Sequence, residues 1–243
     1  MKKYFPGLIV IFILMLFSEV KAQQVRSLWI DGVAGLNNNW ILNQNAYGNQ
    51  EMEYATTFGY TAGAGVSYFY NRQWGYNASV LISKMGQNYA GFQAGGEAKR
   101  KTKLTYLEVP LLLMRQIPYT NYPTWISFGP DILILLKANQ EYSRKGGAEL
   151  PKPIGMASGD VTDRFKRADI ALNISINRMI DVNRYSKTMF LFSINSAIGI
   201  TDINTPDWQI PNTHGIYGKS HNFYIGIKAG MMFKVARLGG AYW

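Results

Sequence analysis

The stretch ADIALNISIN, residues 168–177, alternates apolar and polar side chains without a break. Every second residue from Ala168 to Ile176 is apolar, and those between them are small or polar. Successive side chains of a β-strand point to opposite faces, so this segment has one apolar and one polar face. We therefore predict a strand whose two faces meet different surroundings.

Seven further segments carry the same alternation. They cover about residues 27–36, 58–70, 74–84, 103–114, 124–136, 189–201 and 222–233. Their length suits a tilted strand that crosses a membrane, and aromatic residues cluster at their ends, as at membrane interfaces. The second face is mostly Gly, Ser, Thr, Asn and Ala, which fits a packed interior. The pattern favours an all-β fold, an eight-stranded antiparallel up-and-down transmembrane β-barrel, over a soluble barrel of the lipocalin kind.

The connections between these segments alternate in length. The short gaps are about residues 71–73, 115–123 and 178–188, and the long ones are about 37–57, 85–102, 137–165 and 202–221. Outer-membrane barrels have short periplasmic turns and long external loops. We therefore expect a place in the cell outer membrane, with both termini periplasmic and four long loops outside.

The N-terminus has the features of a secretion signal. Lys2 and Lys3 precede an apolar run of 11 residues, Gly7 to Phe17, which is too short to span a bilayer as a helix. Small residues end this region at Ala22. We predict a signal peptide over residues 1–22 and one outer-membrane β-barrel domain over residues 23–243; an N-terminal anchor is the alternative. The chain has no Cys, which excludes disulfides and a lipid-anchored lipoprotein.

The charge balance is basic. Residues 1–22 hold three of the 25 Lys and Arg and one of the 15 Asp and Glu, which leaves a formal charge of about +8. Because an exported barrel does not meet nucleic acid, the expected partners are outer-membrane lipid and lipopolysaccharide. Lys84, Lys103 and Lys166 have lipid-facing alternation at the predicted external ends of strands. They are candidate lipopolysaccharide contacts, with ordinary solvated lysines as the alternative.

Five charged residues fall on the inner face of the predicted barrel. An eight-stranded barrel is only wide enough inside for side chains to fill, and charges there must pair or hydrogen-bond. We predict a structural charge network in the lumen, with a proton or ion path as the alternative. The network consists of Asp31, Glu108, Asp131, Asp169 and Lys228.

The sequence offers little for catalysis. Some eight-stranded barrels are lipid A deacylases with a Ser–His pair, and this chain has His214 and His221, the latter with Ser220 or Ser83 as an imaginable nucleophile. No flanking motif supports that pair. No His, Asp or Glu cluster has metal-ligand spacing, and no glycine-rich phosphate loop is present. We expect no enzymatic activity, no metal and no cofactor.

The segment YLEVPLLL, residues 106–113, closely resembles a strand of the PorT-type outer-membrane barrels of Bacteroidetes. Weaker likenesses to the same family lie at residues 83–86, 128–130 and 197–203, in matching order and spacing. The resemblance implies an eight-stranded barrel in a Bacteroidetes-type outer membrane. Because one member of that family is linked to type IX secretion, it also leaves open a link to protein secretion.

The functional expectation is a monomeric barrel with a side-chain-filled lumen and a scaffold or accessory role in the cell envelope. It would work through its loops or by docking to other envelope or secretion proteins. A narrow porin-like channel is the alternative, and a lipid A-modifying esterase is the third possibility.

Overall fold

The computed structural model describes residues 26–44, 51–93, 95–118, 120, 123–147, 158–182, 187–211 and 214–238. The predicted signal peptide, residues 1–22, lies outside these ranges. Within them, no helix has the length and apolar character of a membrane span.

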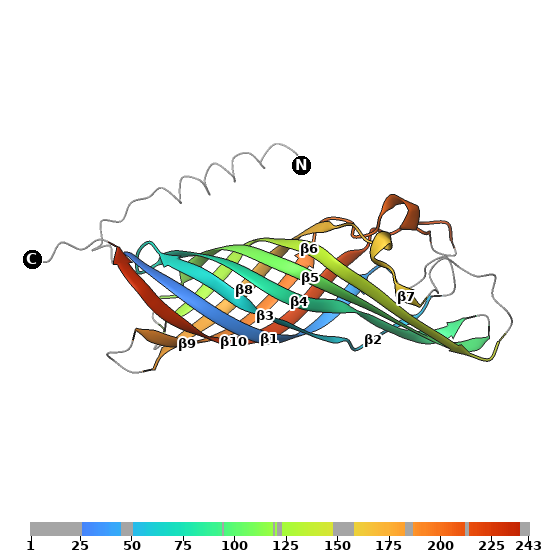
Figure 1. Ribbon diagram of the computed structural model, residues 1–243, viewed down its shortest axis with the longest axis horizontal. Coiled ribbons are helices and arrows are strands. Elements are labelled where there is room, and N and C mark those ends of the chain that lie inside the picture. Colours follow the sequence, from blue (N-terminus) through green and yellow to red (C-terminus); the bar gives the residue numbers. More distant parts are fainter. Residues whose placement is uncertain are drawn as a thin grey trace, which may run out of the picture.

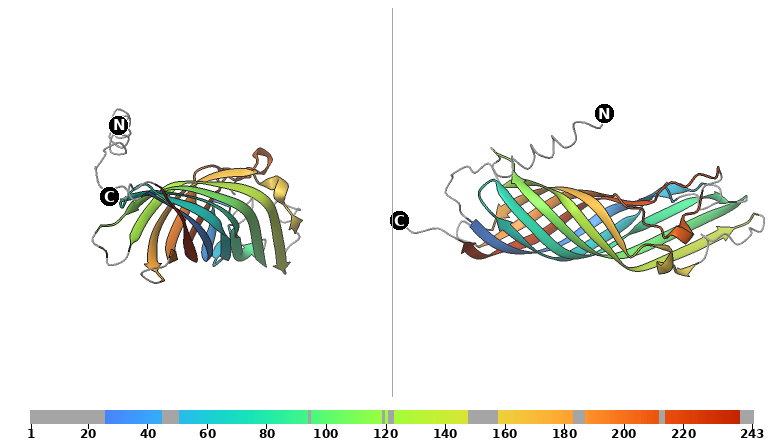
Figure 2. Two further views of the ribbon diagram at one scale, coloured as in Figure 1. Left: turned by 60° about the vertical axis from the view of Figure 1, so that its left-hand side comes forward. Right: turned by 90° about the horizontal axis from the view of Figure 1, so that it is seen from above.

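Eight strands form a closed ring. Each is antiparallel to its neighbours, and the first pairs with the last, Arg26 opposite Leu238. The predicted eight-stranded antiparallel up-and-down barrel is therefore confirmed (Figures 1 and 2). In ring order the strands are β1 (Arg26–Leu42), β3 (Phe58–Phe69), β4 (Trp74–Gln93), β5 (Gly96–Gln116), β6 (Thr124–Lys145), β8 (Ala168–Asp181), β9 (Thr188–Gly199) and β10 (His221–Leu238).

Shorter elements lie outside the ring. The strand β2 (Glu53–Ala55) pairs with β4, and β7 (Gly159–Asp160) pairs with β6. Two single-turn 3-10 helices, η2 (Thr162–Arg164) and η3 (Pro206–Trp208), belong to the long connections before β8 and β10. These elements lie at one end of the barrel, which we call the loop end (Figure 1). The first residues of β1 and the last residues of β10 lie at the other end, which we call the turn end.

The two faces of the wall differ as the alternation predicts. In β8, Ile174 is 56% exposed, whereas the side chain of Asn173 beside it is 4% exposed. The same contrast runs around the ring, where exposed Ile, Leu, Val and Phe side chains form an apolar band on the outer surface. Because a lone barrel in water would not expose such a band, the outer surface is built to face lipid.

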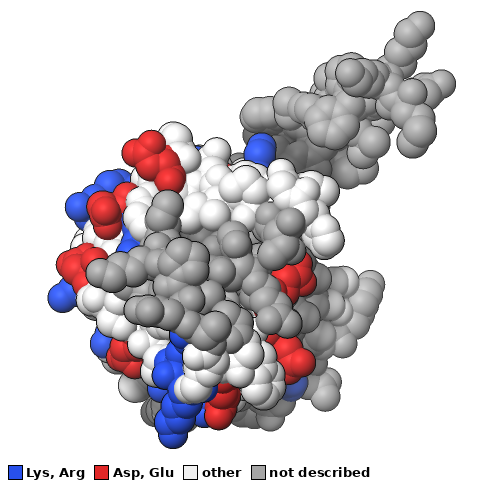
Figure 3. Space-filling view, turned by 90° about the vertical axis from the view of Figure 1, so that its right-hand side faces the viewer, with Lys and Arg blue, Asp and Glu red and all other residues white. Residues whose placement is uncertain are grey.

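Several strands are longer than the sequence pattern indicated, β1 and β10 among them, and the largest extensions are in three neighbouring strands. β4, β5 and β6 have 20, 21 and 22 residues, and only residues 94 and 95 separate β4 from β5. The expectation of a long loop over residues 85–102 is therefore wrong. The alternation continues there, with buried Arg100 and Thr102 on the inner face, but the outer residues become charged, as at Lys101. The strands leave the apolar band and project beyond it (Figure 1). Both basic and acidic side chains surround this end of the barrel (Figure 3).

Candidate functional site

The five predicted lumen charges all lie on the inner face. The exposed fractions of Asp31, Glu108, Asp131 and Asp169 do not exceed 5%, and the Lys228 side chain is 11% exposed. They do not form one network. Glu108, Asp131 and Lys228 form a central cluster, whereas Asp169 lies nearer the loop end and Asp31 nearer the turn end.

The central cluster joins opposite walls of the barrel. Glu108 on β5 accepts a hydrogen bond of 3.0 Å from the hydroxyl of Tyr224 on β10, and its Oε1 lies 3.8 Å from Lys228 Nζ, also on β10. β5 and β10 stand four places apart in a ring of eight, so these contacts cross the lumen. Ser83 on β4 donates to the second oxygen of Glu108.

Asp131 on β6 completes this cluster. Its Oδ2 lies 3.4 Å from the Tyr224 hydroxyl and accepts a hydrogen bond of 3.2 Å from the Asn173 amide. Asn173 also donates to the Tyr224 oxygen at 3.1 Å. Two carboxyl groups, one lysine and one tyrosine thus meet in a place that is almost closed to solvent. Such an arrangement is stable only when its polar groups satisfy one another.

A second crossing lies toward the loop end. Asn222 on β10 donates to the Tyr106 hydroxyl on β5 at 3.1 Å and to Asp169 Oδ2 at 3.0 Å. The Thr201 hydroxyl donates to the other oxygen of Asp169. This group holds β5, β8 and β10 together by a separate set of bonds.

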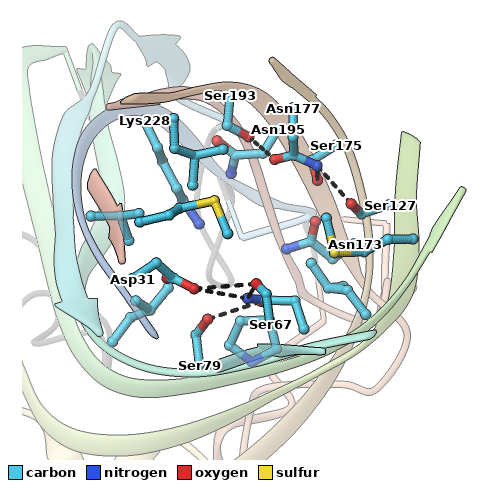
Figure 4. Close-up of a pocket in the computed structure, with 18 of the residues that line it drawn as sticks. Asp31, Ser67, Ser79, Ser127, Asn173, Ser175, Asn177, Ser193, Asn195 and Lys228 are labelled. Carbon is cyan, nitrogen blue, oxygen red and sulfur yellow. Dashed lines mark hydrogen bonds between the residues drawn. The ribbon is translucent and has the colours of Figure 1, made fainter. Parts of the chain in front are cut away.

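Asp31 lines a small polar chamber between the central cluster and the turn end. It accepts hydrogen bonds of 3.3 Å from Ser67 and Asn77, and no ion pair of the described residues includes it. The chamber has a volume of about 60 Å³, and hydroxyl and amide side chains line it together with apolar ones such as Leu112 (Figure 4). A space of this size and polarity holds a few ordered water molecules.

Apolar side chains close the turn end. The rings of Phe69 on β3 and Trp125 on β6 lie 4.8 Å apart between centroids, although two strands separate β3 from β6 in the ring. Trp29 on β1 packs edge-on against Phe69 at 6.4 Å. We call this buried cluster the plug; its members are Trp29, Phe69, Met114, Trp125, Met179 and Met232.

The long connections close the loop end. Phe165 and Ile203 are buried in one apolar cluster with Tyr106, Leu133 and Leu135 of the barrel wall. Above them, Asp202 accepts hydrogen bonds from Tyr217, Gln209 and the backbone N–H of Ser220. Burial, aided by the bond to Asp202, raises the pKa of Tyr217 to about 12. The Tyr217 hydroxyl therefore keeps the proton that it donates.

The sequence did not single out the two tyrosines that take part in the contacts across the lumen. Tyr106 and Tyr224 are inward by alternation, and both are at most 2% exposed. A large aromatic residue on a face made mostly of Ser, Asn and Gly was the available signal. The partners across the lumen depend on strand tilt and register, which the alternation does not give.

Two of the three candidate lipopolysaccharide lysines are not at strand ends. Lys84 and Lys103 lie inside β4 and β5, where the apolar band stops, because both strands continue beyond it. Lys84 Nζ lies 5.2 Å from the centroid of the Tyr60 ring, and Lys103 forms an exposed ion pair with Glu141. Lys166 lies just before β8 and is half-buried.

The structure does not assemble a Ser–His pair from the candidate residues. Ser83 donates into the lumen cluster, Ser220 Oγ accepts from Asn204, and no hydrogen bond of the described residues joins either serine to His221. The buried Nδ1 of His221 has no hydrogen-bond partner within the described chain. The described residues also contain no group of three His, Asp or Glu that could hold a metal ion.

Comparisons with solved structures find similarity to small outer-membrane proteins. Among solved structures, the chain is similar to the Neisserial surface protein A, with a TM-score of 0.42, 11% identity and coverage of 86% of this chain and 99% of that one. OprG from Pseudomonas aeruginosa has a TM-score of 0.41 and 9% identity, over 89% of this chain and 99% of that one. The outer membrane protein AlkL has a TM-score of 0.41 and 12% identity, over 93% of this chain and 98% of that one.

The curated proteins contain no match. The sequence model described as "Outer membrane protein beta-barrel domain" matches residues 21–205, which is most of the chain. The protein therefore belongs to this family of outer-membrane β-barrels.

Proposed function

We propose that the protein is a structural or accessory barrel of the cell envelope that works through its external face and not through an open pore. The observation that carries this proposal is the set of contacts across the lumen at three levels. They are the plug pair Phe69 and Trp125, the Glu108–Tyr224 bond and the Tyr106–Asn222 bond. An apolar constriction alone excludes water and ions from a narrow pore, and here polar bonds reinforce it.

The proposal extends to docking with other envelope or secretion proteins. The resemblance of residues 106–113 to PorT-type barrels supports that extension, and the projecting parts of β4, β5 and β6 provide a surface outside the apolar band. The protein would act there as a monomer, without catalysis. A test is cross-linking in intact envelopes from a photoreactive residue at Lys99. If the protein docks to such partners, the probe at Lys99 should give a discrete adduct, and the same probe placed in the 71–73 turn should not.

A narrow channel is the second candidate. The polar chamber of about 60 Å³ favours it, because hydroxyl and amide groups can replace part of the hydration shell of an ion. The plug and the central cluster lie on the two sides of this chamber, and both argue against a channel.

Planar bilayer recording separates the two functions. We expect no ion conductance from the purified barrel in symmetric salt, because side chains from opposite walls are in contact. The matched variant is Phe69→Ala with Trp125→Ala, which removes the turn-end contact and leaves the clusters nearer the loop end in place. Discrete, reproducible conductance steps from the wild-type barrel would overturn the accessory role in favour of the channel.

The orientation in the membrane gives a second test. We expect the loop end to face the cell exterior, because external loops are the long ones in barrels of this class. A protease site or epitope at Gly146–Gly147 should be reached on intact cells, whereas a tag in the turn of residues 71–73 should be reached only after the outer membrane is opened. The reverse pattern would invert the orientation.

A further inference from the structure

The apolar band ends differently on the two halves of the barrel. On β10, β1 and β3, aromatic residues mark its loop-side edge, among them Trp40 and Phe223, whose ring centroids lie 5.3 Å apart, and Phe58. On β4, β5, β6 and the residues before β8, cations mark it. We call this set the basic rim; it consists of Lys84, Lys101, Lys103, Lys137, Lys166 and Arg167.

The strand register brings three of these lysines together. Lys84 and Lys137 stand opposite Thr105 from its two sides, and Lys103 is two residues from Thr105 on the same face. Diagonal neighbours of this kind are roughly 7–8 Å apart. All three side chains point outward and are exposed. Their ammonium groups can therefore converge on one ligand.

A β-bulge contributes Lys137 to this group. The register of β5 and β6 shifts between Thr105 and Tyr106, so Leu136 and Lys137 both face outward. The bulge places an apolar side chain at the edge of the band and a cation directly beyond it. Just before β8, Arg167 continues the rim, since Leu135 N–H donates to its carbonyl at 2.8 Å.

The positive charge of the rim is not balanced within the described residues. Glu141 pairs with Lys103, and Asp160 lies close enough to Lys137 and Arg167 for both to help lower the pKa of its carboxyl, after the larger effect of the Thr162 hydrogen bonds. Six cations thus face two carboxylates. An excess of cations at the edge of an apolar band matches the level at which lipid phosphates lie.

We propose that the basic rim binds the phosphate groups of lipid A, with the acyl chains lying against the apolar band below. The Lys84 ammonium lies over the Tyr60 ring at the edge of the band, 5.2 Å from the ring centroid, and long cationic side chains at such lipid-facing positions can reach headgroups. The proposal rests on the orientation given above, because lipid A occupies the outer leaflet.

The test measures lipid binding to the full barrel in neutral detergent, by native mass spectrometry and by the unfolding temperature. The probes are bisphosphorylated lipid A, dephosphorylated lipid A and inorganic phosphate. The variant is Lys84→Gln with Lys103→Gln and Lys137→Gln. The control is Arg72→Gln with Lys145→Gln and Lys187→Gln, which removes the same charge from exposed positions away from the rim. Heat-modifiable mobility on gels establishes that each variant is folded.

We expect bisphosphorylated lipid A to bind and stabilise the wild type and the control. Its affinity for the rim variant should be about 100-fold lower. This follows from about fivefold for each lysine, the equivalent of about 1 kcal/mol. Equal binding of the dephosphorylated form, or equal affinity in both triple variants, would reject the site. If millimolar inorganic phosphate displaces lipid A completely, the rim is a site for free anions, and the lipid assignment is overturned as well. Because the assay is independent of orientation, its failure is distinguishable from an inverted barrel, which the accessibility test detects.

Discussion

Glu108→Ala is expected to destabilise the barrel by about 3–5 kcal/mol, because it leaves a buried ammonium without its carboxylate. Glu108 is the one carboxylate of the described residues that forms an ion pair with Lys228. Its removal also breaks the bond from Tyr224, which crosses the lumen, and the bond from Ser83. Reversible urea unfolding in lipid vesicles, followed by tryptophan fluorescence, measures the change.

A double-mutant cycle separates the ion pair from the loss of packing. Glu108→Gln alone and Lys228→Met alone each leave one buried charge uncompensated and should be costly, whereas Glu108→Gln with Lys228→Met removes both charges and should cost less than the sum of those two single changes. Val109→Ala is the matched control, since Val109 is the next residue of β5 and faces lipid. A loss under about 1 kcal/mol for Glu108→Ala would show that the central cluster does not hold the walls together.

The alternation of side chains predicted most of the fold, because a two-residue period can be recognised without knowing which strands pair. It placed Asp31, Glu108, Asp131, Asp169 and Lys228 on the inner face, where the structure has them. It could not tell that these residues divide into three groups. That division depends on which strands face each other across the ring and on how far each strand is shifted along its neighbour.

The sequence pattern failed where the surroundings of the wall change. Before Lys103 the outer residues of β5 are charged, and beyond Lys84 those of β4 are mostly small or polar, as at Asn88, so a search for an apolar outer face ended the strands too early. The inner residues, such as Tyr89 and Ala98, continue the alternation and are fully buried. A search for a buried residue at every second position, on the inner face alone, would have found that β4 and β5 continue.

The bulge on β6 explains why Lys137 was missed. Strict alternation places residues 136 and 138 on one face, whereas the structure turns Leu136 and Lys137 outward together and buries Ala138. A bulge of this kind inserts one residue into one strand of a pair, and nothing in the local sequence specifies it. The composition of the basic rim therefore required the register as well as the sequence.

Ile174→Arg is expected to cost about 2–4 kcal/mol in a bilayer, because it places a charge on the lipid face of the apolar band. Ile174 lies opposite Phe128 on β6 and Ser196 on β9, both of which also face outward. The matched control is Asn139→Arg, an outward position on β6 beyond the band, where the cost should fall to about 0–1 kcal/mol.

The neighbouring change Asn173→Arg should act by a different mechanism. Asn173 is 4% exposed and bonds to Asp131 and Tyr224 inside the lumen, so an arginine there disturbs packing and pairing that do not depend on the solvent outside. Unfolding both variants in bilayers of two thicknesses and in detergent distinguishes the causes. The cost of Ile174→Arg should grow with bilayer thickness, whereas that of Asn173→Arg should stay constant. If Ile174→Arg folds as well as the wild type in the thicker bilayer, the outer face of β8 does not meet lipid, and the apolar band would need another occupant.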